Sequence, residues 1–251
     1  MSPKSRLERV GDAHVLTLDD DPKRNAIGNQ LATELVAHAR SLAANPEARA
    51  LVVTGAGSAF CAGADLPEVF GRERPTDEMR DILRAYYDCF LQIRALPFPT
   101  VAAVNGPAIG AGLNLALSCD VRIAGPQARF GATFSKIGLH PGGGCSSFLV
   151  DTVGSQNALR LLVEGTAVDA ETAVKLGLAS SLAPNPYDEA LSFAQAAANL
   201  EPWLARALKT SVAIASTSTF NAAVEFESWA QAESTHNARF RDWITQFGHA
   251  V

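Results

Sequence analysis

The run from Val101 to Asp120, VAAVNGPAIGAGLNLALSCD, constrains the fold more than any other stretch of this sequence. It begins as a short apolar strand, continues through a loop of Gly and Ala, and ends as an apolar helix. Small residues stand where the helix should start, at Gly106, Gly110, Ala111 and Gly112, and they allow another molecule to approach the backbone. The first N–H groups of a helix lack partners within it and favour negative charge. The run therefore predicts a place that can hold an oxyanion.

A second loop of small residues, Gly55 to Leu66 (GAGSAFCAGADL), follows the apolar strand predicted over Leu51 to Thr54. Two such loops, each after a strand, could each supply one backbone donor to a single oxyanion. Ordinary tight turns have the same composition, so that alternative stays open at this point.

Composition limits the classes of function that this chain can have. The 251 residues suffice for one large α/β domain, or for a domain with an appendage. A formal net charge of −5, with 19% charged residues and no basic stripe, argues against nucleic-acid binding. The first ten residues lack the apolar core of a signal peptide, and no apolar run is long enough to span a bilayer. We therefore expect a cytoplasmic protein.

The cysteines give no metal or disulfide signature. Cys61, Cys89, Cys119 and Cys145 are widely spaced, without a CxxC pair, so we expect reduced and mostly buried thiols and no metal site. Cys61 alone lies in a suspected site loop. No neighbouring His suggests an activated thiolate, which favours a packing role for Cys61.

The order of the patterns predicts an α/β region followed by a helical one. Strand and helix signals alternate over residues 1–185, whereas residues 186–251 show only helical periodicity, with apolar positions that include Trp229 and Trp243. These apolar residues could pack on their own domain or on another subunit. The polar segment Pro67 to Glu78 is predicted to lie on the surface, as a lid or as a solvated connection.

Four motifs, in order, give the chain a family resemblance. They are PKRNAI (Pro22 to Ile27), SAFCAGADL (Ser58 to Leu66), AAVNGPAIGAGLNLALSCD (Ala102 to Asp120) and FGATFSKIGLHPGGG (Phe130 to Gly144). Together they resemble the enoyl-CoA hydratase/isomerase (crotonase) superfamily. The resemblance implies an α/β spiral of ββα turns over residues 1–185 and a helical trimerisation region over 186–251, in trimers or dimers of trimers.

The resemblance also implies a coenzyme A thioester as ligand, without a prosthetic group. Its oxyanion hole maps onto the backbone N–H groups of Ala64 and Ala111, where the family often has Gly at the second position. Coenzyme A contacts map, largely through backbone atoms, onto five residues: Arg24, Ala26, Ala62, Asp65 and Leu66. Asp65 has a second interpretation, because the same residue usually shapes the loop.

The sequence differs from the pattern of the family at the two positions that matter for hydration. Hydratases of the family hold and activate water with two Glu residues, and the aligned residues here are Asn114 and Phe134. An Asn amide can orient water but cannot transfer its proton, and Phe offers no acceptor. Loss of each acid or base removes a factor of roughly 10²–10⁴. Two-Glu hydration is therefore not expected.

His140 is the candidate base, because its usual pKa lies near neutrality and it precedes the PGGG turn. The alternative is a loop His that contacts a backbone carbonyl. The sequence leaves three functions open: a crotonase-class decarboxylase or thioester hydrolase, a non-catalytic acyl-CoA-binding protein, and a structural oligomer with a vestigial pocket.

Overall fold

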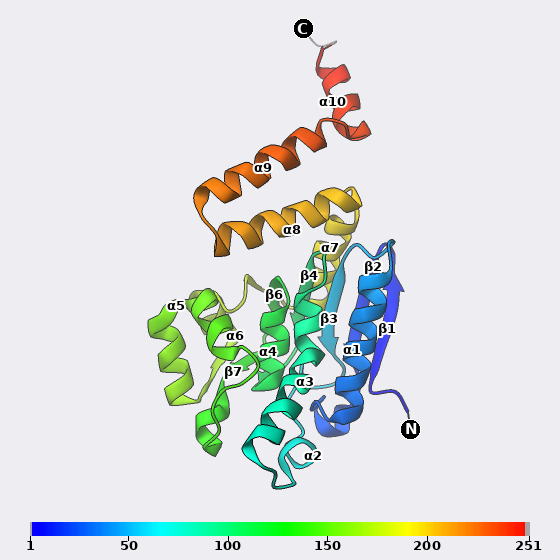
Figure 1. The fold of residues 1–251 in the computed structure, drawn as a ribbon. Helices are drawn as coiled ribbons and strands as arrows, with labels where there is room; N and C mark the ends of the chain where they lie inside the picture. Colours follow the sequence, from blue (N-terminus) through cyan, green and yellow to red (C-terminus); the bar gives the residue numbers. More distant parts are fainter. Residues whose placement is uncertain (1, 249–251) are drawn as a thin grey trace. The chain divides into compact units, whose positions relative to one another are not determined.

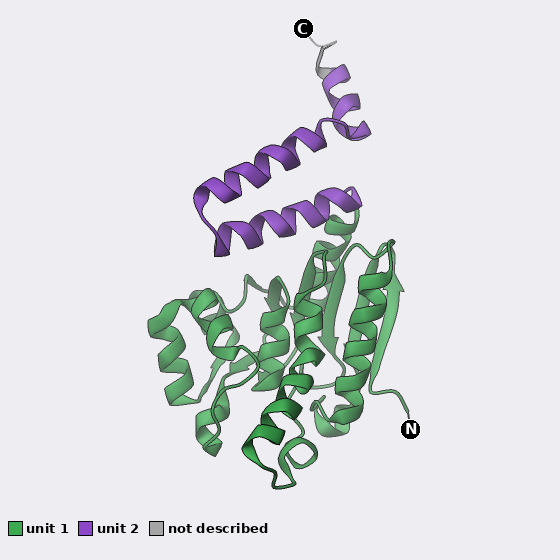
Figure 2. Ribbon diagram, viewed as in Figure 1, with its two compact units in different colours: residues 1–199 green, residues 200–251 purple. Residues whose placement is uncertain are grey.

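The computed structural model describes residues 2–248, and these fall into two compact units, the first ending at Asn199 and the second beginning at Leu200 (Figure 2). Sequence analysis placed the change at residues 185/186, before helix α7 (Pro186–Ala198). Helix α7 instead belongs to the first unit. Its alanine-rich face, including Ala190 and Ala194, is fully buried against the sheet, and side chains of this size let the helix lie close to the strands.

The larger sheet of the first unit has six strands in the order β1-β2-β3-β4-β6-β9 (Figure 1). Strands β1 and β2 form an antiparallel hairpin, and every later neighbour is parallel. The bounds of the strands are β1 (Ser5–Val10), β2 (Ala13–Leu18), β3 (Leu51–Gly55), β4 (Thr100–Val104), β6 (Val121–Ala124) and β9 (Ser181–Leu182).

A second sheet has three strands in the order β5-β7-β8. Its strands are β5 (Pro107–Ile109), β7 (Arg129–Gly131) and β8 (Ala167–Asp169). Strand β4 passes into β5 and then into a helix, and β6 passes into β7 and then into a helix, so ββα turns follow one another. The expected α/β fold is confirmed.

Helices cover both faces of the large sheet. The first unit contains α1 (Asn29–Ala44), α2 (Leu66–Phe70), α3 (Thr76–Arg94), α4 (Ala111–Ser118), α5 (Cys145–Glu164), α6 (Ala170–Leu176) and α7, with 3-10 turns at Asp21–Lys23 and Thr133–Ile137. The second unit contains α8 (Pro202–Thr217), α9 (Phe220–Ser234) and α10 (Ala238–Gly248). No helix within the described residues is long and apolar enough to cross a membrane.

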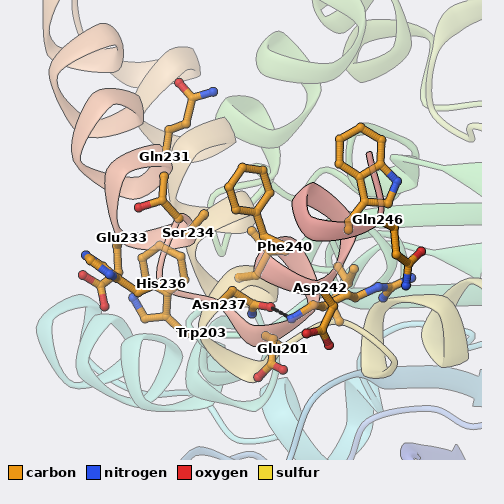
Figure 3. A pocket seen from close by; sticks show the side chains of 15 residues that line it. Glu201, Trp203, Gln231, Glu233, Ser234, His236, Asn237, Phe240, Asp242 and Gln246 are labelled. Carbon is orange, nitrogen blue, oxygen red and sulfur yellow. Dashed lines mark hydrogen bonds between the residues drawn. The ribbon is translucent and has the colours of Figure 1, made fainter. Parts of the chain in front are cut away.

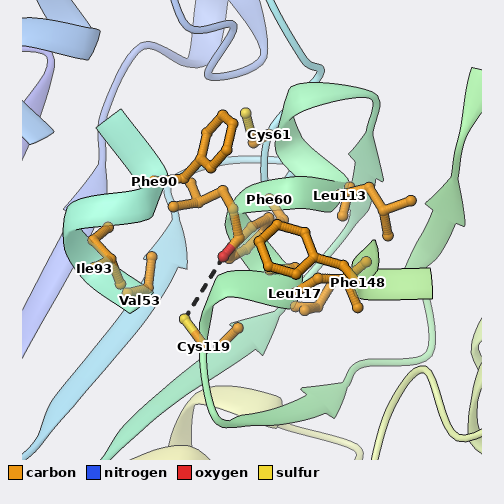
Figure 4. Packing of buried hydrophobic residues seen from close by; sticks show 14 of the residues in the cluster. Val53, Phe60, Cys61, Phe90, Ile93, Leu113, Leu117, Cys119 and Phe148 are labelled. Carbon is orange, nitrogen blue, oxygen red and sulfur yellow. Dashed lines mark hydrogen bonds between the residues drawn. The ribbon is translucent and has the colours of Figure 1, made fainter. Parts of the chain in front are cut away.

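The alternation of side chains along the strands creates two cores. In β2, Leu16 and Leu18 face the larger core under α1, α3, α4 and α5, whereas Ala13 and Val15 face the smaller core under α7. Figure 4 shows the larger core from close by, with Phe60, Phe90 and Phe148 among its labelled residues. This core packs beneath the two loops that follow β3 and β4.

The segment that sequence analysis places on the surface, Pro67 to Glu78, is partly helical, because Leu66–Phe70 forms helix α2 and helix α3 begins at Thr76. Helix α5 is interrupted at Gly154, where φ is 74°, so two helical segments meet at a kink.

Candidate functional site

One cavity of the first unit, of about 140 Å³, lies where the two small-residue loops meet the start of α4. Its walls come from the loop after β3, from α2 and α3, from β5 and α4, and from the segment around the 3-10 turn at Thr133–Ile137. The lining residues are Ala62, Gly63, Ala64, Leu66, Phe70, Leu83, Tyr86, Tyr87, Phe90, Ile109, Gly110, Ala111, Asn114, Thr133, Phe134, Ile137, Leu139, His140 and Gly142.

Backbone hydrogen bonds join the two loops directly. Cys61 N–H donates to Pro107 O (3.0 Å), and Ile109 N–H donates to Cys61 O (3.0 Å). The approach is so close that a β-carbon on Gly112 would lie 2.2 Å from Cys61 O. A β-carbon on Gly63 would lie 3.7 Å from the nitrogen of Ala111. The glycines therefore allow Gly63 and Ala111 to be neighbours across the loops.

The two predicted donor residues line this same cavity, and both have an unused backbone N–H. In the strand-like pairing at Ala64, Ile27 N–H donates to Gly63 O and Asp65 N–H donates to Ile27 O, so the Ala64 N–H takes no part. Ala111 is the first residue of α4, so its N–H has no carbonyl acceptor within the helix. Neither N–H donates to an acceptor among residues 2–248.

Asn25 fixes the first loop from behind, a role that sequence analysis did not identify. It is fully buried in the left-handed region at φ 58°, a conformation that Asn tolerates better than most residues. Its Nδ2 donates to Ala56 O (2.9 Å) and Ala59 O (2.9 Å), and its Oδ1 accepts from Asp20 N–H (2.9 Å). The Asn in PKRNAI was the only sequence signal for this anchor.

Asn114 lies one helical turn beyond Ala111, on the same face of α4. It is only 2% exposed, and its Nδ2 donates to Gly142 O (2.9 Å). This bond fixes the amide orientation, because the opposite orientation would place two oxygens together. The buried Oδ1 has no hydrogen-bond partner among the described residues.

Phe134 and His140 reach the cavity from the segment after β7. The Phe134 ring is partly buried and lies 3.8 Å from the position of a β-carbon on Gly110, so it forms an apolar wall next to Ala111. His140 lines the cavity from an exposed position, with Nδ1 2.8 Å from Pro141 O. The arrangement at His140 matches the alternative of a loop His that contacts a carbonyl.

Helix α3 supplies an aromatic wall of the cavity, formed by Tyr86 and Tyr87. Tyr86 donates through its hydroxyl to Ile27 O (3.1 Å), and a β-carbon on Gly142 would lie 2.3 Å from the Tyr87 hydroxyl. Burial raises the pKa of both phenols, which therefore stay protonated near neutral pH. Their helical spacing was compatible with a core face and with a cavity wall.

The five residues predicted to contact coenzyme A divide into two groups. Ala62 and Leu66 line the cavity, and Leu66 is 42% exposed at its edge. Arg24 and Ala26 lie on the adjoining loop, where Arg24 O accepts from Ala62 N–H (3.0 Å), and neither lines the cavity.

Asp65, the fifth, is held by structural contacts. Its side chain accepts from Glu68 N–H at the start of α2 and pairs with Lys23 Nζ at 2.5 Å. The Lys23 ammonium is the main cause of the lowered pKa of Asp65, and Asp65 in turn raises the pKa of Lys23. These contacts match the second interpretation of Asp65, a residue that shapes the loop.

The cavity has little acid or base chemistry of its own. Tyr86, Tyr87 and His140 are the titratable side chains among its lining residues, and no Asp or Glu of the described residues lines it. Behind the cavity, burial raises the pKa of the Cys61 thiol to about 12, so that thiol is not activated. No group of three His, Cys, Asp or Glu side chains in residues 2–248 is placed to hold a metal ion.

Comparison with known proteins then decides the family. A family model described as enoyl-CoA hydratase/isomerase matches residues 11–249. The chain belongs to this family. The resemblance of the four sequence motifs is thereby confirmed, and members of the enoyl-CoA hydratase/isomerase family act on coenzyme A thioesters.

Similar members of the enoyl-CoA hydratase/isomerase family come from bacteria and a fungus. A Mycobacterium tuberculosis protein named probable enoyl-CoA hydratase EchA14 is 47% identical over 185 residues, covering 73% of this chain and 72% of its own. The enoyl-CoA isomerase/hydratase fer4 of Mycosarcoma maydis is 36% identical over 193 residues, covering 73% and 69%. The enoyl-CoA hydratase structure from Bacillus anthracis has a TM-score of 0.90 at 25% identity, covering 98% and 96%.

A larger concavity of about 1100 Å³ lies within the second unit, among α8, α9 and α10. Figure 3 shows Trp203, Gln231 and Phe240 among its labelled residues. None of the predicted site residues lines this concavity. The candidate site of this family member is therefore the cavity of the first unit.

Proposed function

We propose that this chain binds an acyl- or enoyl-CoA thioester and holds the thioester carbonyl oxygen between the backbone N–H groups of Ala64 and Ala111. One observation carries the proposal: two unused N–H groups belong to residues on the wall of the same cavity. A carbonyl oxygen that gains negative charge as an enolate or a tetrahedral intermediate is stabilised by two such donors. The family often has Gly at the position of Ala111, and Ala provides the same backbone N–H donor.

The chemistry that follows binding is not two-Glu hydration. Asn114 and Phe134, which align with the two Glu residues of hydratases, both line the cavity, and no carboxylate of the described residues does. Decarboxylation fits better, because the breaking carbon–carbon bond to CO₂ supplies the electron pair that forms the enolate, and no base is needed for that step. The α-carbon of the enolate then takes a proton from solvent water, which completes the reaction. Thioester hydrolysis would instead require a base such as His140.

A second candidate is a non-catalytic acyl-CoA-binding protein. The apolar wall favours it, because Phe134 and Leu139 suit an acyl chain and cannot transfer protons. Both candidates share the ligand and the donors, so binding is tested first and turnover second.

Titration calorimetry with butanoyl-CoA should give saturable binding, and crotonyl-CoA should bind while its absorbance stays nearly constant. Each missing acid or base slows hydration by roughly 10²–10⁴-fold. Coenzyme A alone serves as the control for contacts outside the acyl cavity. Absence of both heat and thermal shift at saturating thioester would remove the binding proposal. Rapid loss of the crotonyl absorbance would instead show that hydration persists.

Release of CO₂ from malonyl-CoA separates the decarboxylase from the binding protein. Turnover that persists in His140→Ala would favour decarboxylation, whereas hydrolysis dependent on His140 would favour the hydrolase. A chain that binds each thioester and turns over none is the non-catalytic binding protein.

We further propose that the second unit mediates self-association, as a trimer or a dimer of trimers. Among the described side chains of residues 200–246, the buried hydrophobic ones are Ala205, Ala207 and Ala223. Larger apolar side chains are exposed to solvent, and the exposed fraction is 82% for Phe220 and 72% for Trp229. A helical unit without a core of large side chains needs another surface to cover it.

Sedimentation analysis should therefore find the chain as a multiple of three, and Trp229→Ser should shift it toward smaller species. Gln231→Ser, on the same helix α9, is the control and should leave the assembly unchanged. A wild-type monomer at micromolar concentration would contradict the proposal.

A further inference from the structure

Decarboxylation leaves an enolate whose α-carbon needs a proton, and the cavity wall carries a hydroxyl group suited to deliver it. The lining side chains with a hydrogen on nitrogen or oxygen are Tyr86, Tyr87, Asn114, Thr133 and His140. An amide does not transfer its protons near neutral pH, and the alcohol of Thr is a much weaker acid than a phenol. The two tyrosines and His140 are therefore the groups to compare.

Two of these three groups already make other contacts. Tyr86 donates its hydroxyl hydrogen to Ile27 O (3.1 Å). His140 Nδ1 lies 2.8 Å from Pro141 O, so the neutral ring donates there and keeps only an acceptor at Nε2. The Tyr87 hydroxyl donates to no acceptor among the described residues, and it is not one of their enclosed polar atoms without a partner. Its hydrogen is therefore free to face a ligand in the cavity.

The Tyr87 hydroxyl lies beside the glycine turn that also contacts helix α4. A β-carbon on Gly142 would lie 2.3 Å from this hydroxyl, and Gly142 O accepts from Asn114 Nδ2 at 2.9 Å. Asn114 is one helical turn beyond Ala111. A thioester whose carbonyl oxygen meets the N–H of Ala111 therefore has its α-carbon in the part of the cavity that Tyr87 borders.

The surroundings of Tyr87 suit a group that gives up a proton and regains it. Its ring packs against Phe90, with ring centroids 6.0 Å apart, and against Tyr86, with centroids 6.4 Å apart, and these contacts fix its direction. Burial raises the pKa of the Tyr87 phenol, so the hydroxyl still holds its proton when the enolate forms. The neighbouring Gly143 N–H acts in the opposite direction on this pKa, because it stabilises the phenolate that remains after the transfer.

We propose that Tyr87 is a catalytic acid that gives its hydroxyl proton to the α-carbon of the enolate. The electron pair of the enolate forms the new carbon–hydrogen bond, and the phenolate takes a proton back from water, so water remains the source of the proton. The inference rests on the proposed decarboxylation and adds the residue that completes it. A donor fixed on one wall reaches one face of the planar enolate, so the product should carry the new hydrogen on that face.

Decarboxylation of methylmalonyl-CoA in D₂O tests this inference, because the propanoyl-CoA formed is chiral at its deuterated α-carbon. The wild-type chain should give predominantly one enantiomer. Tyr87→Phe removes only the hydroxyl oxygen and should still release CO₂, because bond cleavage precedes protonation, but its product should be nearly racemic. Tyr86→Phe, the same change one position earlier on α3, is the matched control and should keep the enantiomeric excess of the wild type.

The outcomes separate this inference from the proposed function. An equal enantiomeric excess in Tyr87→Phe and the wild type would overturn the inference while decarboxylation stands, and so would a racemic wild-type product. If the wild-type chain binds thioesters and releases no CO₂, the decarboxylase proposal fails and the catalytic acid fails with it. Absence of thioester binding would overturn the proposed function itself. Circular dichroism and thermal melting check that both variants fold.

Discussion

Ala111→Pro is expected to lower thioester binding or turnover by about a hundredfold while the chain stays folded. Removal of one oxyanion donor reduces rates by about 10²–10³-fold in enzymes that use such a site. Proline removes the N–H and places its ring carbon where the oxygen would lie. The fold should tolerate it, because Ala111 is the first residue of α4, where Pro is favoured, and its N–H has no partner among the described residues.

The residue before the substitution is also compatible with it. Gly110 has φ 55° and ψ −116°, the mirror image of the extended conformation that residues before proline prefer. Gly is achiral, so the mirror conformation carries no penalty there.

Ala111→Gly is the matched control for the donor. It keeps the N–H and removes only a methyl group, so affinity for butanoyl-CoA should stay within a few-fold of the wild type. Circular dichroism and thermal melting check that both variants fold. Equal affinity of Ala111→Pro and Ala111→Gly for butanoyl-CoA would show that the Ala111 N–H holds no oxygen.

Gly112→Ala should both destabilise the protein and weaken ligand binding. The new β-carbon would lie 2.2 Å from the carbonyl oxygen of Cys61 and 2.8 Å from its carbon, and backbone on both sides leaves no side chain to rotate away. Overpacking of this kind typically costs about 1–3 kcal/mol. Relief of the clash must move the loop of Ala64 away from the start of α4, so the two donors no longer meet.

Gly28→Ala provides the comparison for this effect. Its β-carbon would also meet a close atom, Glu68 Oε2 at 2.3 Å, but that atom ends a flexible side chain that can turn aside. Denaturant unfolding should show a clearly smaller loss of free energy for Gly28→Ala than for Gly112→Ala. Equal losses would mean that the contact between the two loops is not as rigid as the hydrogen bonds at Cys61 indicate.

Much of the fold is determined by local sequence patterns. Alternating apolar residues such as Leu16 and Leu18 define a strand with two faces, because successive side chains of a strand point to opposite sides. The Asp169 side chain caps α6, and Gly177, at φ 85°, ends it, and both residue types are typical of those helix positions. The motifs also predicted the family, which the match over residues 11–249 confirms.

Other features depend on contacts between distant residues. Helix α7 has the periodicity of any amphipathic helix, and only the sheet that it covers assigns it to the first unit. The pairing of Asp65 with Lys23 joins residues 42 positions apart, which no spacing rule predicts. The cavity wall formed by Tyr86 and Tyr87 likewise depends on where α3 packs.

For the candidate site, too, some features follow from the sequence and others only from the tertiary structure. The sequence alone determined that two loops of small residues follow two strands and expose backbone N–H groups, because Gly and Ala permit close approach wherever they occur. Only the tertiary structure decided that the loops meet, through Cys61 and its partners in β5, and that Ala64 and Ala111 line one cavity. Parallel strands β3 and β4 end at the same edge of the sheet, and this long-range pairing brings together donors that lie far apart in the chain.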